Sequence, residues 1–253
     1  MAEKEDRNYE KIVVDTCVLA GTIMIESGSE VSRVNDTMLR IAKNAGLKDP
    51  QIYVTVTGII MSGTADSGAQ VGSVDKRSFD LEKVTEVNEL SREFAAKKID
   101  INTFYDSLVH IDDLVSMFPE WLQILGAGIV GATLVVVFRN DIHDFWITLA
   151  IAALGWIIYY LMGKYIQVKF LSEFLAAVGV AFAATFAVIL GLGINSDDII
   201  VGGMMPLVPG IPLTNAIRDM LSGNLVSGIA RGVEALLSAC ALGFGVALVI
   251  RFF

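Results

Sequence analysis

Five long apolar stretches crowd the second half of this 253-residue chain, and they constrain its fold more than any other feature. Each stretch is long enough to cross roughly 30 Å of hydrocarbon as a helix that rises 1.5 Å per residue. Because all five fall within residues 119–253, buried core helices are a poor explanation for them. The predicted membrane spans are residues 121–138, 145–162, 170–192, 199–217 and 232–250.

Charged residues concentrate in the first half of the chain. Residues 1–118 hold 13 Lys and Arg and 20 Asp and Glu, whereas residues 119–253 hold 6 and 8. This division predicts an acidic N-terminal domain, residues 1–118, and a transmembrane domain, residues 119–253. The net charge of −9 argues against a nucleic-acid partner, because phosphate binding needs a basic surface. The two cysteines and two histidines are widely separated and form no metal or cofactor motif.

The two ends of the chain are predicted to lie on opposite sides of the membrane. The opening residues MAEKEDRNYE are charged and lack the apolar core of a signal peptide, which keeps the N-terminal domain in the cytosol. The loops agree, because cytosolic loops carry an excess of basic residues. Four basic residues fall on the side predicted to be cytosolic and two on the other; the four are Lys164, Lys169, Arg218 and Arg231. We therefore expect a multi-pass protein of the cell membrane, surrounded by the lipid bilayer.

The N-terminal domain shows both helical and strand-like periodicity. We expect helices at residues 9–27, 30–45, 81–98 and 102–117, and strands at 51–61 and 70–79. Ser29 and Asp80 are the expected N-caps of two of these helices, and Asn102 or Thr103 begins the last. The predicted fold is an α-helical integral membrane protein with five transmembrane helices, one of them broken by prolines, and an N-terminal cytosolic α+β domain.

The fourth span carries three of the chain's five prolines, Pro206, Pro209 and Pro212, within seven residues. Each proline lacks an N–H and disfavours a helical residue before it, which argues against a continuous helix. A broken span is tolerated only where protein or a water-filled cavity surrounds the break, and many secondary transporters bind substrate at such breaks. Pro209 lies ten residues into the span, near mid-membrane. A kinked or re-entrant packing helix is the alternative.

The half-helix that begins near Pro212 is predicted to favour an anion. Its N-terminal N–H groups and the positive end of its dipole would point at the break, where a carboxylate could bind. Asn215 adds a hydrogen-bonding side chain, and Arg218 lies about one turn further on. The predicted substrate-binding residues are Pro209, Gly210, Pro212, Thr214, Asn215, Arg218 and Asp219.

The predicted spans also contain two acidic residues and one glycine-rich segment that need an interpretation. Ionisable residues are rare in spans and usually face a cavity, so Glu173 and Glu234 are predicted coupling residues, with Arg231 as the expected ion partner of Glu234. Snorkelling of both acids to the interface is the alternative. Residues 126–131 match the nucleotide-binding pattern GxGxxG, but they lie in a charge-free run, where close helix packing explains them better.

An enzymatic function has little support in the sequence. The charged residues Glu26, Glu30, Arg33, Asp36 and Arg40 could supply the acid and base of a hydrolase, but surface ion pairs explain them equally well. We find no paired nucleophile and base, and we predict no catalytic residue, no cofactor and no metal. A membrane-tethered hydrolase and a ligand-sensing module remain the alternatives to transport.

Three segments resemble the threonine/serine exporter family: ESGSEVSRVNDTMLRIAKNAG (26–46), YVTVTGIIMS (53–62) and PLVPGIPLTNAIRDMLSGNLVSGIARGVEALL (206–237). The chain is most similar to the N-terminal-domain component of that family. The resemblance implies export of small carboxylate-bearing metabolites, namely threonine and serine or a succinate-like dicarboxylate. Because fused members carry more spans than the five predicted here, it also implies a split transporter. The partner would be a second, shorter membrane subunit of the family or another copy in a homo-oligomer.

Overall fold

The computed structural model describes residues 2–64, 68–75, 78–114, 118–139, 142–166 and 168–252. The chain forms two compact units. Unit 1 comprises Met1–Ser116 together with Ile211–Gly232, and unit 2 comprises Met117–Gly210 together with Val233–Phe253. Unit 1 thus combines the N-terminal residues with a segment that the sequence divides between the fourth and fifth spans.

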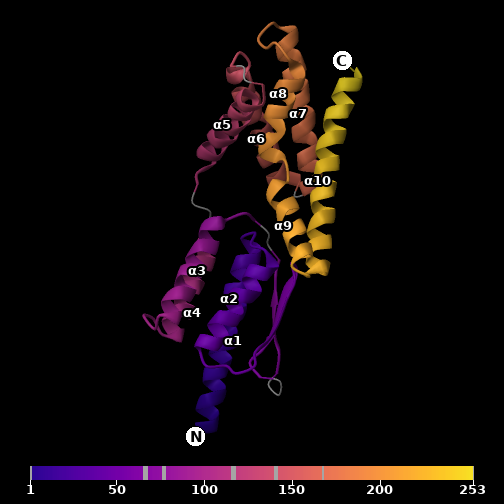
Figure 1. Cartoon of the computed structure of the whole chain (residues 1–253). Coiled ribbons are helices and arrows are strands. Elements are labelled where there is room, and N and C mark those ends of the chain that lie inside the picture. The colour runs from indigo at the N-terminus through magenta and orange to yellow at the C-terminus, as the bar shows by residue number, and fades with distance from the viewer. Residues whose placement is uncertain are drawn as a thin grey trace. The chain divides into compact units, whose positions relative to one another are not determined.

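The N-terminal part of unit 1 contains helices and a small sheet (Figure 1). The helices are α1 (Ala2–Glu26), α2 (Val31–Asn44), α3 (Leu81–Ala95) and α4 (Ile101–Asp113). The strands are β1 (Gln51–Val54), β2 (Gly58–Ser62) and β3 (Gln70–Ser73), which pair antiparallel in the order β1-β2-β3. Helix α1 contacts the other three helices and strands β2 and β3, so it forms the centre of this unit.

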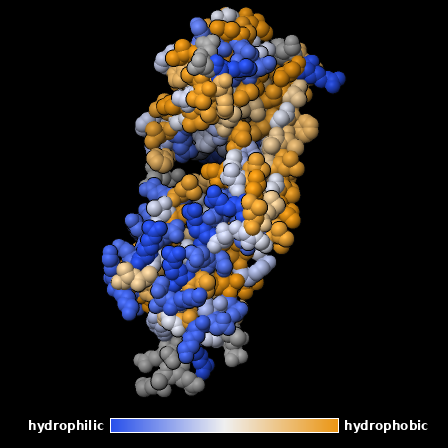
Figure 2. Space-filling model, viewed as in Figure 1, coloured by the Kyte–Doolittle hydropathy of each residue, from blue (hydrophilic) through white to orange (hydrophobic). Residues whose placement is uncertain are grey.

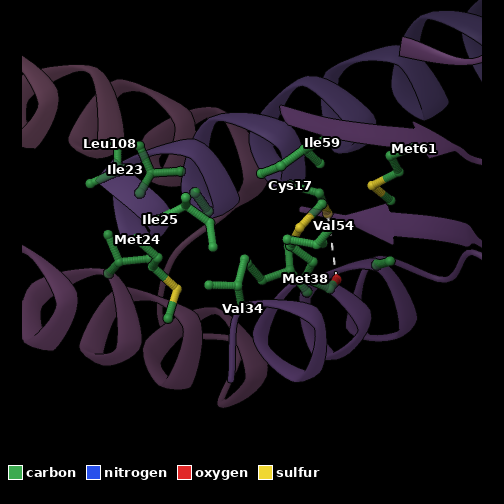
Figure 3. Packing of buried hydrophobic residues seen from close by; sticks show 14 of the residues in the cluster. Cys17, Ile23, Met24, Ile25, Val34, Met38, Val54, Ile59, Met61 and Leu108 are labelled. Carbon is green, nitrogen blue, oxygen red and sulfur yellow. Dashed lines mark hydrogen bonds between the residues drawn. The ribbon is translucent and has the colours of Figure 1, made fainter. Parts of the chain in front are cut away.

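The core of unit 1 gathers around the apolar face of α1. Figure 3 shows Cys17, Ile23 and Met24 of α1 facing side chains from α2, β2 and α4. The Cys17 thiol is fully buried and donates a weak hydrogen bond to the carbonyl of Met38 at 3.7 Å. Burial in this apolar surrounding raises the pKa of the Cys17 thiol to about 12, because the thiolate would lose its hydration.

The prediction of a single strand over residues 51–61 is wrong, because the segment folds into the hairpin β1–β2. The turn follows Val54, which pairs with Ile59 across the hairpin. At this turn the Thr55 hydroxyl donates to the Gly58 carbonyl at 2.8 Å and accepts from the Gly58 N–H at 3.1 Å. A threonine hydroxyl can thus offer the backbone partners that compete with a continuous strand.

Two helix caps in unit 1 test the predictions for helix starts. The prediction for α3 is confirmed, because the Asp80 side chain accepts the N–H of Lys83. The prediction for α4 is wrong, because its N-cap is Asp100, whose carboxylate accepts the N–H of Thr103 at 2.9 Å. Hydrogen bonds from the Thr103 side chain and backbone lower the pKa of Asp100. Helix α4 ends at Asp113, and residues 115–117 of the predicted helix lie outside the described residues.

Unit 2 is built from four long apolar helices and a shorter helical segment among its described residues. They are α5 (Glu120–Arg139), α6 (Phe145–Ile166), α7 (Lys169–Ile189), α8 (Ser196–Met204), the 3-10 turn η1 (Met205–Leu207) and most of α10 (Leu225–Phe252). Helix α9 (Gly210–Leu221) follows η1 along the chain and belongs almost entirely to unit 1. In the space-filling view, hydrophobic residues cover much of the surface of the long helices, and hydrophilic residues gather over the N-terminal helices (Figure 2).

Four helices are long and apolar enough to cross a membrane, namely α5, α6, α7 and α10. The segments Ser196–Leu207 and Gly210–Leu221 meet the same criterion only when they are taken together, as one broken span or as a re-entrant loop. The described part of the chain therefore has four candidate spans, or five with the broken one, as a helical integral membrane protein requires. The predicted break is confirmed: the helix stops at Leu207, and Pro212 lies in the first turn of α9.

Small residues let the helices of unit 2 approach closely. A Cβ added to Gly131 of α5 would lie 2.6 Å from the carbonyl oxygen of Gly202 in α8 and 2.6 Å from Cβ of Ala152 in α6. A Cβ added to Gly128 would lie 2.9 Å from the carbonyl oxygen of Leu149. These contacts support the helix-packing interpretation for Gly128 and Gly131, whereas a Cβ at Gly126 would meet nothing within 4 Å.

Candidate functional site

The N-terminus of α2, at the junction with α1, has no capping hydrogen bond from its own N-cap side chain. Helix α1 ends at Glu26, and the chain turns at Gly28, whose φ of +88° suits glycine. Helix α2 begins at Val31, with Glu30 at the N-cap position and no hydrogen bond from the Glu30 side chain to the helix. The prediction of Ser29 as the N-cap is therefore wrong by one residue.

Side chains of α9 and α10, 187 to 202 residues further along the chain, bind the backbone groups of this junction. The Asp219 carboxylate accepts the N–H of Val31 at 2.9 Å and so caps α2. Asn215 donates from Nδ2 to the carbonyl of Gly28 at 2.9 Å. Arg231 of α10 donates from Nη2 to the carbonyl of Ser29 at 2.7 Å. All of these residues belong to unit 1.

Two ion pairs complete the arrangement. Arg231 Nη1 lies 3.1 Å from Asp219 Oδ2, and both residues are buried, with 9% and 0% of their surface exposed. Arg218 Nη1 lies 2.7 Å from Glu30 Oε2 at a more open position, since the Arg218 side chain is 58% exposed. Arg33 approaches the other Glu30 oxygen at 3.4 Å. We call this cluster of Gly28–Val31, Asn215, Arg218, Asp219 and Arg231 the junction cluster.

The electrostatics of the junction cluster favour carboxylates. The N-terminus of a helix carries partial positive charge, and its first N–H groups have no partner within the helix. Here the 14-residue helix α2 and two guanidinium groups provide positive charge at the same place, and Asp219 and Glu30 occupy it. Removing either partner of a buried ion pair leaves an uncompensated charge, so the Asp219–Arg231 pair strongly favours this arrangement once it has formed.

The predicted substrate-binding residues are distributed over the break and α9. Pro209 and Gly210 lie at the break in unit 2, and Pro212 and Thr214 lie in the first turns of α9 in unit 1, where the Thr214 hydroxyl donates to the carbonyl of Ile211. Asn215, Arg218 and Asp219 lie further along α9, in the junction cluster. The structure thus brings the last three together with Gly28–Val31 through the contacts described above.

The predicted coupling acids lie on a short polar ladder between α7 and α10 in unit 2. Glu173 is 3% exposed, and its Oε1 accepts a hydrogen bond from the Ser238 hydroxyl at 3.0 Å. One helical turn away on each helix, Lys169 Nζ lies 2.8 Å from Glu234 Oε1. Arg231, the expected partner of Glu234, also forms an ion pair with Asp219.

Sequence reasoning missed the backbone half of the junction cluster. The carbonyls of Gly28 and Ser29 and the N–H of Val31 carry no sequence signature, and their partners lie 187 to 202 residues further along the chain. In the sequence, Glu30 stands out only as one of a set of charged residues. The one signal that joins the two regions is the family resemblance, which rests on residues 26–46 and 206–237 together.

Comparison with known proteins decides the family. A family model described as "Putative threonine/serine exporter" matches residues 15–253. The chain belongs to the threonine/serine exporter family. The family is one of transporters, and its model covers both the junction cluster and the broken span.

Individual relatives of this threonine/serine exporter family member are distant. The chain is 22% identical to a "Probable threonine/serine exporter" of Mycobacterium tuberculosis over 97% of its own length, but it spans only 47% of that protein. It is 23% and 24% identical to proteins of Klebsiella aerogenes and Escherichia coli, each named "Probable succinate transporter subunit YjjP". These two alignments cover 96% and 95% of this chain and 95% and 94% of the relatives. No solved structure matches the chain.

Proposed function

We propose that this chain is a component of a secondary transporter that exports small carboxylate-bearing metabolites, either threonine and serine or a succinate-like dicarboxylate. The family match over residues 15–253 carries this proposal. The names of the relatives support it and give no support to the hydrolase alternative. The broken helix pair Ser196–Leu207 and Gly210–Leu221 is the physical feature that a substrate path of this kind uses.

We assign substrate contact to the region that includes Pro209, Gly210, Pro212, Thr214, Asn215, Arg218 and Asp219. The proline break leaves backbone groups without helical partners, and the N-terminus of α9 provides N–H groups of the kind that bind carboxylates. The cationic side chain nearest to this turn along α9 is Arg218, which is more than half exposed. Such a guanidinium can form two parallel hydrogen bonds with a carboxylate.

Glu173 is our proposed carrier of a coupling proton, with Glu234 as a charged group one helical turn away along the polar ladder and Arg231 as the proposed ion partner of Glu234. A carboxyl group that is 3% exposed within a membrane-length apolar helix is costly to ionise, so it can exchange a proton when its surroundings change. Its Oε2 atom is buried and has no hydrogen-bond partner in the part of the chain that the structure describes. That atom is available to hold the proton.

The proposed setting is the cytoplasmic membrane, with the N-terminus in the cytosol and the long helices in the bilayer. Two relatives are named as transporter subunits, which supports a second subunit for this chain as well. The chain spans less than half of the exporter from M. tuberculosis. The partner that we propose is a shorter family member or another copy of this chain.

An efflux experiment in cells tests this function. Cells that lack their own exporters would be loaded with succinate or with a threonine-containing dipeptide, and the acids released would be measured with the chain expressed alone or with a shorter family member. We expect faster release of at least one acid, and slower release in Arg218→Ala and Asn215→Ala variants that still reach the membrane. Release equal to that of empty-vector cells in both settings would contradict the proposal.

A further inference from the structure

Each arginine of the junction cluster forms an ion pair with a carboxylate of the chain itself. Arg231 is paired with Asp219, and Arg218 is paired with Glu30, so two carboxylates of the chain itself fill the positive end of α2. Asp219 has no exposed surface and is bound by both a backbone N–H and a guanidinium. These are the groups with which proteins bind carboxylate and phosphate ligands.

A second observation indicates unused binding capacity at the same place. The Ser29 hydroxyl is buried, with 5% of the residue exposed, and it has no hydrogen-bond partner among the described residues. The carbonyl of the same residue accepts from Arg231. A buried hydroxyl without a hydrogen-bond partner costs free energy. In the arrangement with Asp219 and Glu30 in place, the Ser29 hydroxyl is such a group.

We infer that the junction cluster is the capture site for the two carboxylates of a dicarboxylate substrate, and that Asp219 and Glu30 are internal substitutes that keep the site closed. The inference rests on the proposed function and names the substrate class of its site. A dicarboxylate replaces both Asp219 and Glu30. One of its carboxylates binds Arg231 and the Val31 N–H, and the other binds Arg218. An amino acid has only one carboxylate, so it would leave one of the two cations with its internal partner.

The exchange conserves the number of ion pairs, which makes it energetically feasible. A ligand shifts a conformational equilibrium only by its differential affinity for the two states. Substrate carboxylates take over both guanidinium groups, and the Ser29 hydroxyl supplies the additional hydrogen bond. Meanwhile Asp219 and Glu30 are released to water, where their carboxylates are well hydrated. Release of Asp219 also frees α9 from the N-terminus of α2, so substrate capture and movement of α9 become one event.

Binding of succinate to the purified full-length chain in detergent tests the inference by calorimetry. The variant Asp219→Asn removes the internal competitor but keeps an oxygen that can accept the Val31 N–H. We expect succinate to bind this variant about tenfold more tightly, because the competent state no longer competes with a closed one. Arg231→Gln should weaken binding by at least about tenfold, since a charge-assisted contact is lost. A purely structural Asp219–Arg231 pair would instead make both variants bind more weakly, which would overturn the inference.

Glu30→Gln decides the question if Asp219→Asn does not fold. Glu30 pairs with the more exposed of the two guanidinium groups, and neutralising it frees Arg218 while both partners of the buried Asp219–Arg231 pair are kept. Succinate should then bind about threefold more tightly or better; unchanged or weaker binding would overturn the inference.

Asp144→Asn is the matched control. Asp144 is also a buried carboxylate that accepts hydrogen bonds from backbone N–H groups, those of Ile194 and Asn195, but it lies in unit 2. It should leave the succinate affinity unchanged.

Ligand controls separate this inference from the function itself. Succinamide has the shape of succinate without its charges and should not bind, and threonine should bind more weakly than succinate. Equal binding of succinate and succinamide would overturn the inference. If cells export succinate while Asp219→Asn and Glu30→Gln bind it no more tightly than the unaltered chain, the exporter function stands and the capture site is wrong. If the binding pattern holds without export, the proposed function fails instead.

Discussion

Replacing Gly131 with alanine should separate the helices of unit 2. The new Cβ would lie 2.6 Å from the carbonyl oxygen of Gly202 and 2.6 Å from the Ala152 Cβ, about 0.8 Å short of the 3.4 Å at which ordinary contact begins. Neither contact is the end of a flexible side chain, so α8 or α6 must shift. Overpacking of this kind costs about 1–3 kcal/mol, and at about 2–4 °C per kcal/mol for a chain of this size we expect the midpoint of thermal unfolding to fall by roughly 2–12 °C.

Gly126→Ala is the matched control on the same helix. A Cβ at Gly126 would meet nothing within 4 Å, and alanine favours a helix over glycine by about 1 kcal/mol. The assay is thermal unfolding of both purified variants in one detergent, followed by tryptophan fluorescence. Gly131→Ala should unfold at a lower temperature than the unaltered chain, and Gly126→Ala at the same or a higher one. Equal midpoints for the two variants would refute the close packing of α5 against α6 and α8.

Three further outcomes follow from single side chains. Asp144→Ala leaves two backbone N–H groups before α8 without their acceptor, at about 1–3 kcal/mol each, so the same unfolding assay should show a lower midpoint; an unchanged one would contradict the cap. In a Cys240→Ser background, Cys17 should resist iodoacetamide at pH 8, because with a pKa of about 12 only about one thiol in ten thousand is ionised. The thiol should react once the chain unfolds. Rapid labelling of the folded chain would contradict the burial of Cys17. Glu173→Gln should preserve insertion but remove the dependence of export on an imposed pH gradient, and export that keeps this dependence would exclude Glu173 as the proton carrier.

The sequence predicts best those features that depend on local composition. The break at Pro209 follows from prolines that cannot donate N–H groups, and the structure contains it. The cap at Asp80 follows from a carboxylate placed just before an apolar periodicity. The sequence does not predict the hairpin at Thr55–Gly58, because its turn uses a threonine hydroxyl and lacks the asparagine–glycine pair that marks the commonest hairpins.

The candidate site was harder to predict than the fold, because half of it is backbone. Asn215, Arg218 and Asp219 stand out in the sequence as polar residues after a proline break, which favours a role with substrate. Their partners at Gly28 and Val31 are a carbonyl and an N–H, which every residue of the chain possesses. Only the folded chain shows which of these groups a side chain 188 residues away will reach.

Counterflow of labelled succinate and threonine in proteoliposomes tests the central claim most directly. Vesicles containing the purified chain, alone or with a shorter family member, would be loaded with unlabelled acid and diluted into labelled acid. The account predicts transient uptake of label above that of protein-free vesicles in at least one of these settings, and its loss in the Arg231→Gln variant. Uptake of neither acid in either setting would contradict the claim that this chain is part of an exporter of small carboxylates.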